Sequence, residues 1–280
     1  MRVPFVPEVL DVRSRIAAVW EELTPAERRV AASVRLDPEL LLVRSSAEIA
    51  AETGTSKATV SRLVRALGFR DAADIRDTLM TARGSGLPWA AEDAAHVDQR
   101  LVEARNLDAA FASLVRADRR GLARRILRAR RVLVLGARNG HPIALQLRAQ
   151  LAQVRPDVRL GPAPSQTFGE EVADLDTRDL VIVVTVRRHA AGIARLIERC
   201  AQKADVVVLG DPTAAVLAVP ARTAILCPVD SPSAFDSLSA LAAVIAGIAN
   251  DVYEAAGAAG RARVEAIADA YATLGELGEP

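Results

Sequence analysis

The sequence is poor in the residue types that hold metals and disulfides. Its two cysteines, Cys200 and Cys227, form no C-x-x-C motif, so a reduced protein without a disulfide framework is expected. The three histidines, His96, His141 and His189, show no paired-ligand spacing. We accordingly expect no metal ion and no other cofactor.

Long apolar segments are also absent. No run approaches the roughly 18–20 apolar residues of a bilayer-spanning helix. Residues 1–15 lack the apolar stretch and the small-residue cleavage site of a secretory signal. With 51% apolar and 25% charged residues, the 280-residue chain has the balance of a soluble globular protein and is long enough for two domains. We expect a cytoplasmic location.

Net charge is almost absent as well. At +1, the chain is no polycation that would coat nucleic acid, so any DNA binding must come from a local patch. Lysine occurs only at Lys57 and Lys203, and the other basic residues are arginines. Because arginine is so common here, a single arginine carries little functional weight.

Helical periodicity without a convincing strand characterises residues 1–81. Thr24, Pro25 and Glu27 form a helix start with an N-cap, a first-turn proline and a capping-box glutamate. Gly68 is the expected C-cap of a later helix. The expected helices cover about 9–22, 25–37, 46–52, 56–67 and 72–81.

From Arg131 onward, short β-branched runs alternate with helical stretches. Because these runs are apolar on both faces, they indicate a parallel sheet covered on both sides. Strands are expected at 131–136, 157–160, 179–186, 204–210 and 223–228, and helices at 92–129, 233–256 and 261–274. The sequence therefore predicts an all-helical domain (1–81), a Gly- and Pro-rich linker (82–91), and an α/β domain (92–280) with a five-stranded parallel sheet flanked by helices.

Residues 46–69 have the pattern of a helix-turn-helix. Ala50 supplies the small residue needed where two helices touch, and Gly54 tolerates a positive φ in the turn. An apolar stripe from Val60 to Leu67 would be buried, leaving a face whose hydroxyls and cations can reach base edges and phosphates. The expected DNA-binding residues are Ser56, Lys57, Ala58, Thr59, Ser61, Arg62 and Arg65.

The charge distribution favours this interpretation. Between Thr55 and Arg70 there are four basic residues and no acidic one, whereas residues 1–83 hold 13 basic and 12 acidic residues. The alternative is a pair of core helices with a basic solvent face, since the small-residue spacing alone is common. Thr55 departs from the pattern, because such turns usually place an aliphatic residue there.

Two runs, LTPAERRVAASV (23–34) and SSAEIAAETGTSKATVSRLVRALGF (45–69), resemble the N-terminal domain of the RpiR family of bacterial regulators. The resemblance covers about residues 10–275 and is more specific in the first domain. It implies that the helix-turn-helix is joined to a sugar isomerase (SIS) domain, which in this family binds phosphosugars.

The SIS resemblance implies a ligand pocket with altered loops. SIS domains hold a sugar phosphate with a G-x-G-x-S loop and an S-x-S-G loop, through hydroxyls and amides at helix N-termini. The equivalent segments, 136–140 and 185–189, keep only Gly136 and Thr185 and add arginines. The implied ligand-binding residues are Gly136, Arg138, Asn139, His141, Thr185, Arg187, Arg188, His189 and Ser231.

Two interpretations of this pocket stay open. Guanidinium groups at the carboxyl ends of adjacent strands, where open parallel sheets bind ligands, can hold a phosphate or carboxylate bidentately. Alternatively, the site binds nothing and the arginines are ordinary surface residues.

Enzymatic and nucleotide-binding functions fit less well. Segment 136–140 lacks the glycines of a dinucleotide fingerprint, and the chain has no G-x-x-x-x-G-K-[ST] motif. Glu170, Glu171 and His189 are formally available as an isomerase base, but the altered loops and the attached DNA reader argue against turnover.

The sequence thus predicts a DNA-binding transcriptional regulator, not an enzyme, whose operator affinity responds to a small anionic metabolite. A homo-oligomer, dimer or tetramer, would present recognition helices to half-sites about 34–36 Å apart or a multiple of that distance. The alternatives are a phosphosugar isomerase-type enzyme and a ligand-blind regulator with a degenerate SIS dimerisation domain.

Overall fold

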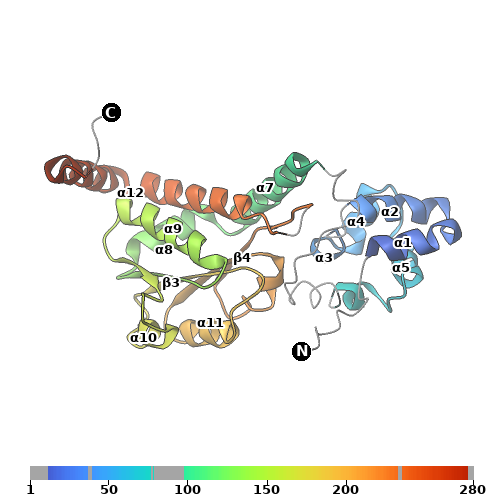
Figure 1. The fold of residues 1–280 in the computed structure, drawn as a ribbon, viewed down its shortest axis with the longest axis horizontal. Helices are drawn as coiled ribbons and strands as arrows, with labels where there is room; N and C mark the ends of the chain where they lie inside the picture. The colour runs from blue at the N-terminus through green and yellow to red at the C-terminus, as the bar shows by residue number, and fades with distance from the viewer. Residues whose placement is uncertain (1–11, 37–39, 77, 79–97, 233–234, 277–280) are drawn as a thin grey trace, which may run out of the picture. The chain divides into compact units, whose positions relative to one another are not determined.

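The computed structural model describes residues 12–36, 40–76, 78, 98–232 and 235–276. The chain divides into two compact units, Met1–Gly86 and Leu87–Pro280, and each is described by itself (Figure 1). The predicted linker at 82–91 and the predicted helix start near Val9 lie outside the described residues. In the part that is described, no helix is long and apolar enough to cross a membrane.

The first unit is helical, as predicted. A single core contains the predicted stripe of Val60, Leu63, Val64 and Leu67, each at most 3% exposed. A short helix at 40–43 was not predicted. The elements are α1 (Val12–Val19), the 3₁₀ helix η1 (Trp20–Glu22), α2 (Pro25–Leu36), α3 (Leu40–Val43), α4 (Ser46–Glu52), α5 (Lys57–Ala66) and a last helix at 72–76.

Side-chain caps explain where these helices begin. The Glu27 carboxylate accepts hydrogen bonds from the backbone amide and the hydroxyl of Thr24, so the predicted capping box at α2 is present. Ser45 and Glu48 form a second capping box at α4. Gly68 follows α5 with a φ of 88°, the left-handed conformation expected of a C-cap glycine.

The second unit contains the predicted five-stranded parallel sheet. Its strand order is β2-β1-β3-β4-β5, and each pair of neighbours is parallel. The chain places β2 on one side of β1 and then crosses over to place β3, β4 and β5 on the other side. The strands are β1 (Val132–Gly136), β2 (Val158–Gly161), β3 (Leu180–Thr185), β4 (Asp205–Gly210) and β5 (Thr223–Leu226).

Alternate residues of the central strands enter two separate cores. Leu180, Ile182 and Val184 of β3 belong to the core under α7, α8, α9 and α12, whereas Val181 and Val183 belong to the core on the α10 and α11 side (Figure 1). The period-2 geometry of a strand therefore explains why these runs are apolar throughout. The helices are α7 (Gln99–Arg116), α8 (Arg119–Arg128), α9 (Gly140–Val154), α10 (Phe168–Val172), α11 (Ile193–Ala201) and α12 (Ser239–Leu274), with the 3₁₀ helix η3 at Pro212–Ala215.

Two helix boundaries differ from the sequence prediction. The helical stretch expected at 92–129 is two helices, because Asp118 adopts a left-handed φ of 53° and its carboxylate caps α8 at Gly121. The helix expected from residue 233 begins only at Ser239. The break expected between the two C-terminal helices is present, because α12 consists of two helices that meet at a kink, where Gly257 takes a non-helical φ of 55° that glycine tolerates.

The two cysteines lie on opposite faces of the sheet. Cys200 belongs to the core beside α11 and Cys227 to the core beside α12, and both are fully buried free thiols. Burial raises the pKa of Cys200 to about 11 and that of Cys227 to about 12. Neither thiol is therefore an activated nucleophile.

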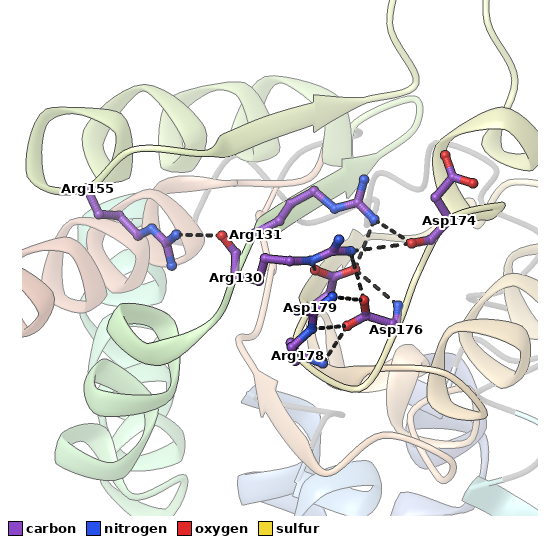
Figure 2. Close-up of polar contacts among 7 residues, drawn as sticks. All are labelled: Arg130, Arg131, Arg155, Asp174, Asp176, Arg178 and Asp179. Carbon is purple, nitrogen blue, oxygen red and sulfur yellow. Dashed lines mark hydrogen bonds and ion pairs between the residues drawn. The ribbon is translucent and has the colours of Figure 1, made fainter.

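A buried carboxylate ties the amino ends of the two central strands together (Figure 2). The Asp179 side chain, just before β3, is fully buried and pairs with Arg130 and Arg131, which precede β1, at 2.8 and 2.9 Å. It also accepts the backbone amide of Asp176 at 3.1 Å. Burial raises the pKa of Asp179, but these hydrogen bonds outweigh it and hold the pKa below its ordinary value.

A second buried ion, Arg155, is held by carbonyl groups. Its guanidinium donates to the backbone oxygens of Ile126 and Ala129 at the end of α8, at 2.5 and 2.9 Å, and to that of Arg130 at 3.2 Å (Figure 2). These oxygens include acceptors that the last turn of a helix leaves unpaired. Arg155 is therefore the C-terminal cap of α8, supplied from the far end of α9.

We expect Asp179→Asn to lower the free energy of unfolding by about 3 kcal/mol, because it leaves two arginines without their buried counter-ion. Since folding depresses the pKa of Asp179, its contribution is present above the unfolded pKa near ~3.9 and is lost as the pH falls below that value and through the lower folded pKa. Urea unfolding followed by circular dichroism at neutral pH and in a series of acidic buffers below the unfolded pKa measures both effects. Asp108→Asn, an exposed change on α7, is the control. A loss as small as the control's would contradict the assignment.

Candidate nucleic-acid interface and ligand crevice

The α4–turn–α5 segment has the geometry of a helix-turn-helix. Ala50 is 5% exposed where α4 meets the core, and Gly54 takes a φ of 59° in the turn. The Ser56 side chain accepts the backbone amide of Thr59 at 3.2 Å, so it is the N-cap of α5. Thr55, unusual for such a turn, hydrogen-bonds through its hydroxyl to Thr53 at 2.9 Å.

The face of α5 opposite the apolar stripe is open and basic. Ser56, Lys57, Ala58, Arg62 and Arg65 are exposed and Ser61 is half-buried, and α5 carries no acidic residue. Thr59 differs from its prediction as a surface contact. It is 3% exposed and its hydroxyl pairs with that of Ser56, so it packs the start of α5.

Arg62 is held in place by α2. Its Nε lies 3.2 Å from the Glu27 carboxylate, whose side chain is 10% exposed, while the Arg62 side chain is 57% exposed. Hydrogen bonds from Thr24 lower the pKa of Glu27 more than burial raises it, and Arg62 lowers it further. The same carboxylate therefore caps α2 and orients one guanidinium on the exposed face of α5.

In the second unit, α9 packs closely against the carboxyl ends of β1 and β3 at two glycines. A Cβ on Gly140, the first residue of α9, would lie 2.5 Å from the Val184 carbonyl oxygen of β3. A Cβ on Gly136 would lie 2.6 Å from the Cβ of Ala144. Gly140 therefore stands where no side chain fits. This close approach lets α9 begin at Gly140, two residues before Pro142.

Three of the predicted ligand residues lie around the start of α9. Arg138, with a φ of 52°, and Asn139 are exposed and hydrogen-bond through their side chains to no residue that the structure describes. His141 is half-buried, and its Nδ1 lies 3.2 Å from the Gly136 carbonyl oxygen. Asn139 gives α9 no side-chain cap, and the backbone amides of Gly140 and His141 donate instead to backbone carbonyl oxygens just before the helix, at 3.0 and 3.1 Å.

A chain of hydrogen bonds fixes the loop after β3. The Thr213 hydroxyl donates to buried Asp211 at 2.6 Å. It then accepts from Nε2 of His189 at 2.9 Å, and Nδ1 of His189 accepts from the Thr185 hydroxyl at 2.8 Å. Burial lowers the pKa of His189, although the charge of Asp211 opposes this. His189 is therefore a neutral residue with both ring nitrogens engaged.

Arg187 is bound to carboxylates of the chain itself. Its guanidinium pairs with Asp236, with Nε 2.9 Å from one carboxylate oxygen, and its backbone amide donates to Asp211 at 3.0 Å. Burial lowers the pKa of Arg187, but the hydrogen bond to Asp236 and the nearby carboxylates together outweigh it, so the pKa is raised. The remaining predicted residues, Arg188 and Ser231, are half-buried and each interacts with another group.

Sequence reasoning missed the acidic partners of this crevice. Asp211 directly follows β4 and Asp236 precedes α12, so both lie at the same edge of the sheet as Arg187. A signal existed for Asp211, since it comes right after a buried strand, but the family resemblance pointed only to the loops after the first and third strands. Glu170 and Glu171, considered as isomerase bases, bond to Thr167 and to the backbone amide of Ala163.

Comparisons with known proteins agree with both units. Residues 11–82 match the model of the helix-turn-helix domain of the rpiR family. No curated protein sequence matches the chain significantly.

Two solved structures share its fold. The sugar isomerase domain of the RpiR transcription factor from Sphaerobacter thermophilus is 17% identical with a TM-score of 0.54, over 61% of this chain and 99% of that one. The Vibrio vulnificus NanR protein, solved in complex with ManNAc-6P, is 17% identical with a TM-score of 0.53, over 94% of this chain and 99% of that one. The five-stranded parallel domain therefore has the sugar isomerase fold. The chain thus combines a region that matches the rpiR-family helix-turn-helix domain, residues 11–82, with a domain of the sugar isomerase fold.

Proposed function

We propose that the protein is a transcriptional regulator that reads DNA with α5 and senses a small anionic metabolite in the crevice of its SIS domain. The observation that carries the proposal is the acid-free face of α5, on which Lys57, Arg62 and Arg65 are exposed inside an rpiR-type helix-turn-helix. Guanidinium groups read guanine edges and hold phosphates, and the Ala58 methyl can contact thymine. Such a protein acts where DNA lies, which fits a cytoplasmic location.

The proposed effector is a sugar phosphate or another small phosphate or carboxylate. NanR, which shares the fold, was solved with ManNAc-6P. In this chain the exposed side chains of Arg138 and Asn139 offer donors to an anion at one side of the crevice. Arg187 stands at the other side with Asp236 as its present partner. An anionic effector would compete with Asp236 for Arg187.

Competition between the effector and Asp236 would couple effector binding to the DNA-binding domain. The residue after Asp236, Ser237, donates its hydroxyl to Glu103 on α7 at 2.9 Å and its amide to the Val229 carbonyl at 3.0 Å. α7 is the first described helix after the predicted linker. Displacement of Asp236 would loosen this segment, and the effector would then shift the population of two arrangements of α7.

We propose that two or more chains assemble through the SIS domain. α7 exposes Leu101, Phe111 and Val115, of which Val115 is 64% and Leu101 53% exposed. Residues 101 and 115 are two heptads apart, so they share one face of the helix. A second copy would cover these apolar side chains and bring two α5 helices to one operator.

Catalysis is not part of the proposal. An isomerase needs a base that is free to accept a proton from substrate. Here both nitrogens of His189 are engaged, and Glu170 and Glu171 cap backbone amides.

Replacing Arg65 with alanine is expected to weaken binding to a selected operator by about 1–3 kcal/mol if the side chain reads a base edge. The operator is a duplex selected from a random pool by the wild-type protein, and a gel-shift assay at fixed salt gives the dissociation constants. Arg29→Ala, an exposed change on α2, is the matched control. Equal affinity of the Arg65 variant and the control would remove α5 as the reading helix.

Two substitutions in the crevice are expected to act in opposite directions. Arg187→Gln removes a guanidinium and should abolish stabilisation by an anionic ligand, whereas Asp236→Asn removes the competing carboxylate and should strengthen it several-fold. Thermal shift with ManNAc-6P, other sugar phosphates and inorganic phosphate measures both. If both variants lose or both keep the wild-type response, Arg187 does not bind the effector.

The proposed assembly through α7 can be tested by placing a charge on its apolar face. Val115→Glu should convert the dimer or larger assembly into a monomer, because it places a charge in an apolar contact. Light scattering coupled to size-exclusion chromatography gives the mass directly, with Arg105→Glu on the same helix as the charge control. A wild-type monomer, or an unchanged mass in the variant, would exclude this surface.

A further inference from the structure

A groove lined by arginines runs along the SIS domain at the end of the sheet opposite the ligand crevice. It lies between the end of α7, the helix α8 and the start of β5. β4 and β5 begin here, at Asp205 and Thr223, whereas the crevice lies where the strands end. The arginines of the groove are Arg116, Arg124, Arg125, Arg128 and Arg222.

The region around this groove contains more arginines than its ion pairs and hydrogen bonds engage. Residues 116–131 contain eight arginines and one acidic residue, Asp118. Arg125 has a structural task, since it forms a bidentate pair with Asp205 at 2.5 and 2.6 Å and donates to the Thr223 hydroxyl. Asp118 caps α8, and Arg222 reaches the same Asp205 only at 3.9 Å.

Three arginines of the groove are left over. Arg116, Arg124 and Arg128 are exposed, and their side chains form no hydrogen bond or ion pair with any residue in the described part of the chain. Arg124 and Arg128 are four residues apart on α8, where like charges on one face destabilise a helix. No contact among the described residues offsets this repulsion, and an anionic partner would relieve it.

We propose that this groove binds the sugar–phosphate backbone of double-stranded DNA, apart from the base reading by α5. Single guanidiniums this exposed are screened by solvent and hold a small anion weakly. A row of them gains more from a polyanion, because each phosphate contact releases condensed counterions. Arginine also matches phosphate geometry with paired donors. The proposal extends the proposed function by a sequence-independent contact on the second domain.

The test compares four forms of the full chain. They are the wild type, the groove variant Arg124→Gln/Arg128→Gln, the matched control Arg159→Gln/Arg195→Gln, and the reading-helix variant Arg65→Ala. Arg159 and Arg195 are exposed arginines on β2, at the opposite sheet edge, and on α11. Dissociation constants are measured across a salt series on a duplex selected by the wild type and on an unrelated duplex of equal length.

We expect the groove variant to lose affinity for both duplexes alike, roughly tenfold or more at low salt, and to lower the slope of log K against log salt by about 0.9 for each arginine that contacts a phosphate. The control pair should leave the slope unchanged. The Arg65 variant should lose its preference for the selected duplex. If the wild type selects no sequence, the proposed base reading by α5 fails, while the groove is still judged on the unrelated duplex.

Three results would overturn the groove proposal. One is a groove variant that matches the control pair on both duplexes. Another is a wild type that binds neither duplex. The third is a small-anion site, seen as saturable stabilisation of the wild type by inorganic phosphate that the groove variant loses while its DNA affinity stays unchanged.

Discussion

The buried carboxylate of Asp211 organises the carboxyl ends of β3 and β4, where the ligand crevice is proposed. It accepts the backbone amide of Arg187 from the loop after β3 and both donors of Thr213 from η3. Through Thr213 it connects to His189 and then to Thr185, so the segments after β3 and β4 are joined by one carboxylate. A buried carboxylate is stable only when such donors surround it.

The two ends of the parallel sheet therefore serve different purposes. At the amino ends, Asp179 neutralises Arg130 and Arg131 and joins β1 to β3 (Figure 2). At the carboxyl ends, Asp236 neutralises Arg187, with side chains 20% and 15% exposed. The pairs of Asp179 hold the strands together. Under the proposed function the pair of Asp236 and Arg187 would instead be a switch, because an anionic effector would compete with Asp236.

Much of the fold could be predicted because its signals are local. Capping residues such as Thr24 and Ser56 place helix starts, and strands buried on both faces are apolar throughout, so five parallel strands follow from five runs. The boundary that failed within the helix expected at 92–129 depends on a single backbone conformation. Asp118 breaks that helix by turning left-handed, which hydrophobic periodicity does not show.

The sequence by itself determined the family resemblance, the parallel sheet and the residues that face solvent on α5, since each follows from spacing along one segment. Only the tertiary structure decided what the crevice arginines contact. Arg187 looked available for an anion, yet Asp236, 49 residues away, already pairs with it. Thr59 looked exposed, yet packing beneath α5 buries it. Such pairings depend on which loops meet at a sheet edge, and a counter-ion's distance in sequence says nothing of its distance in space.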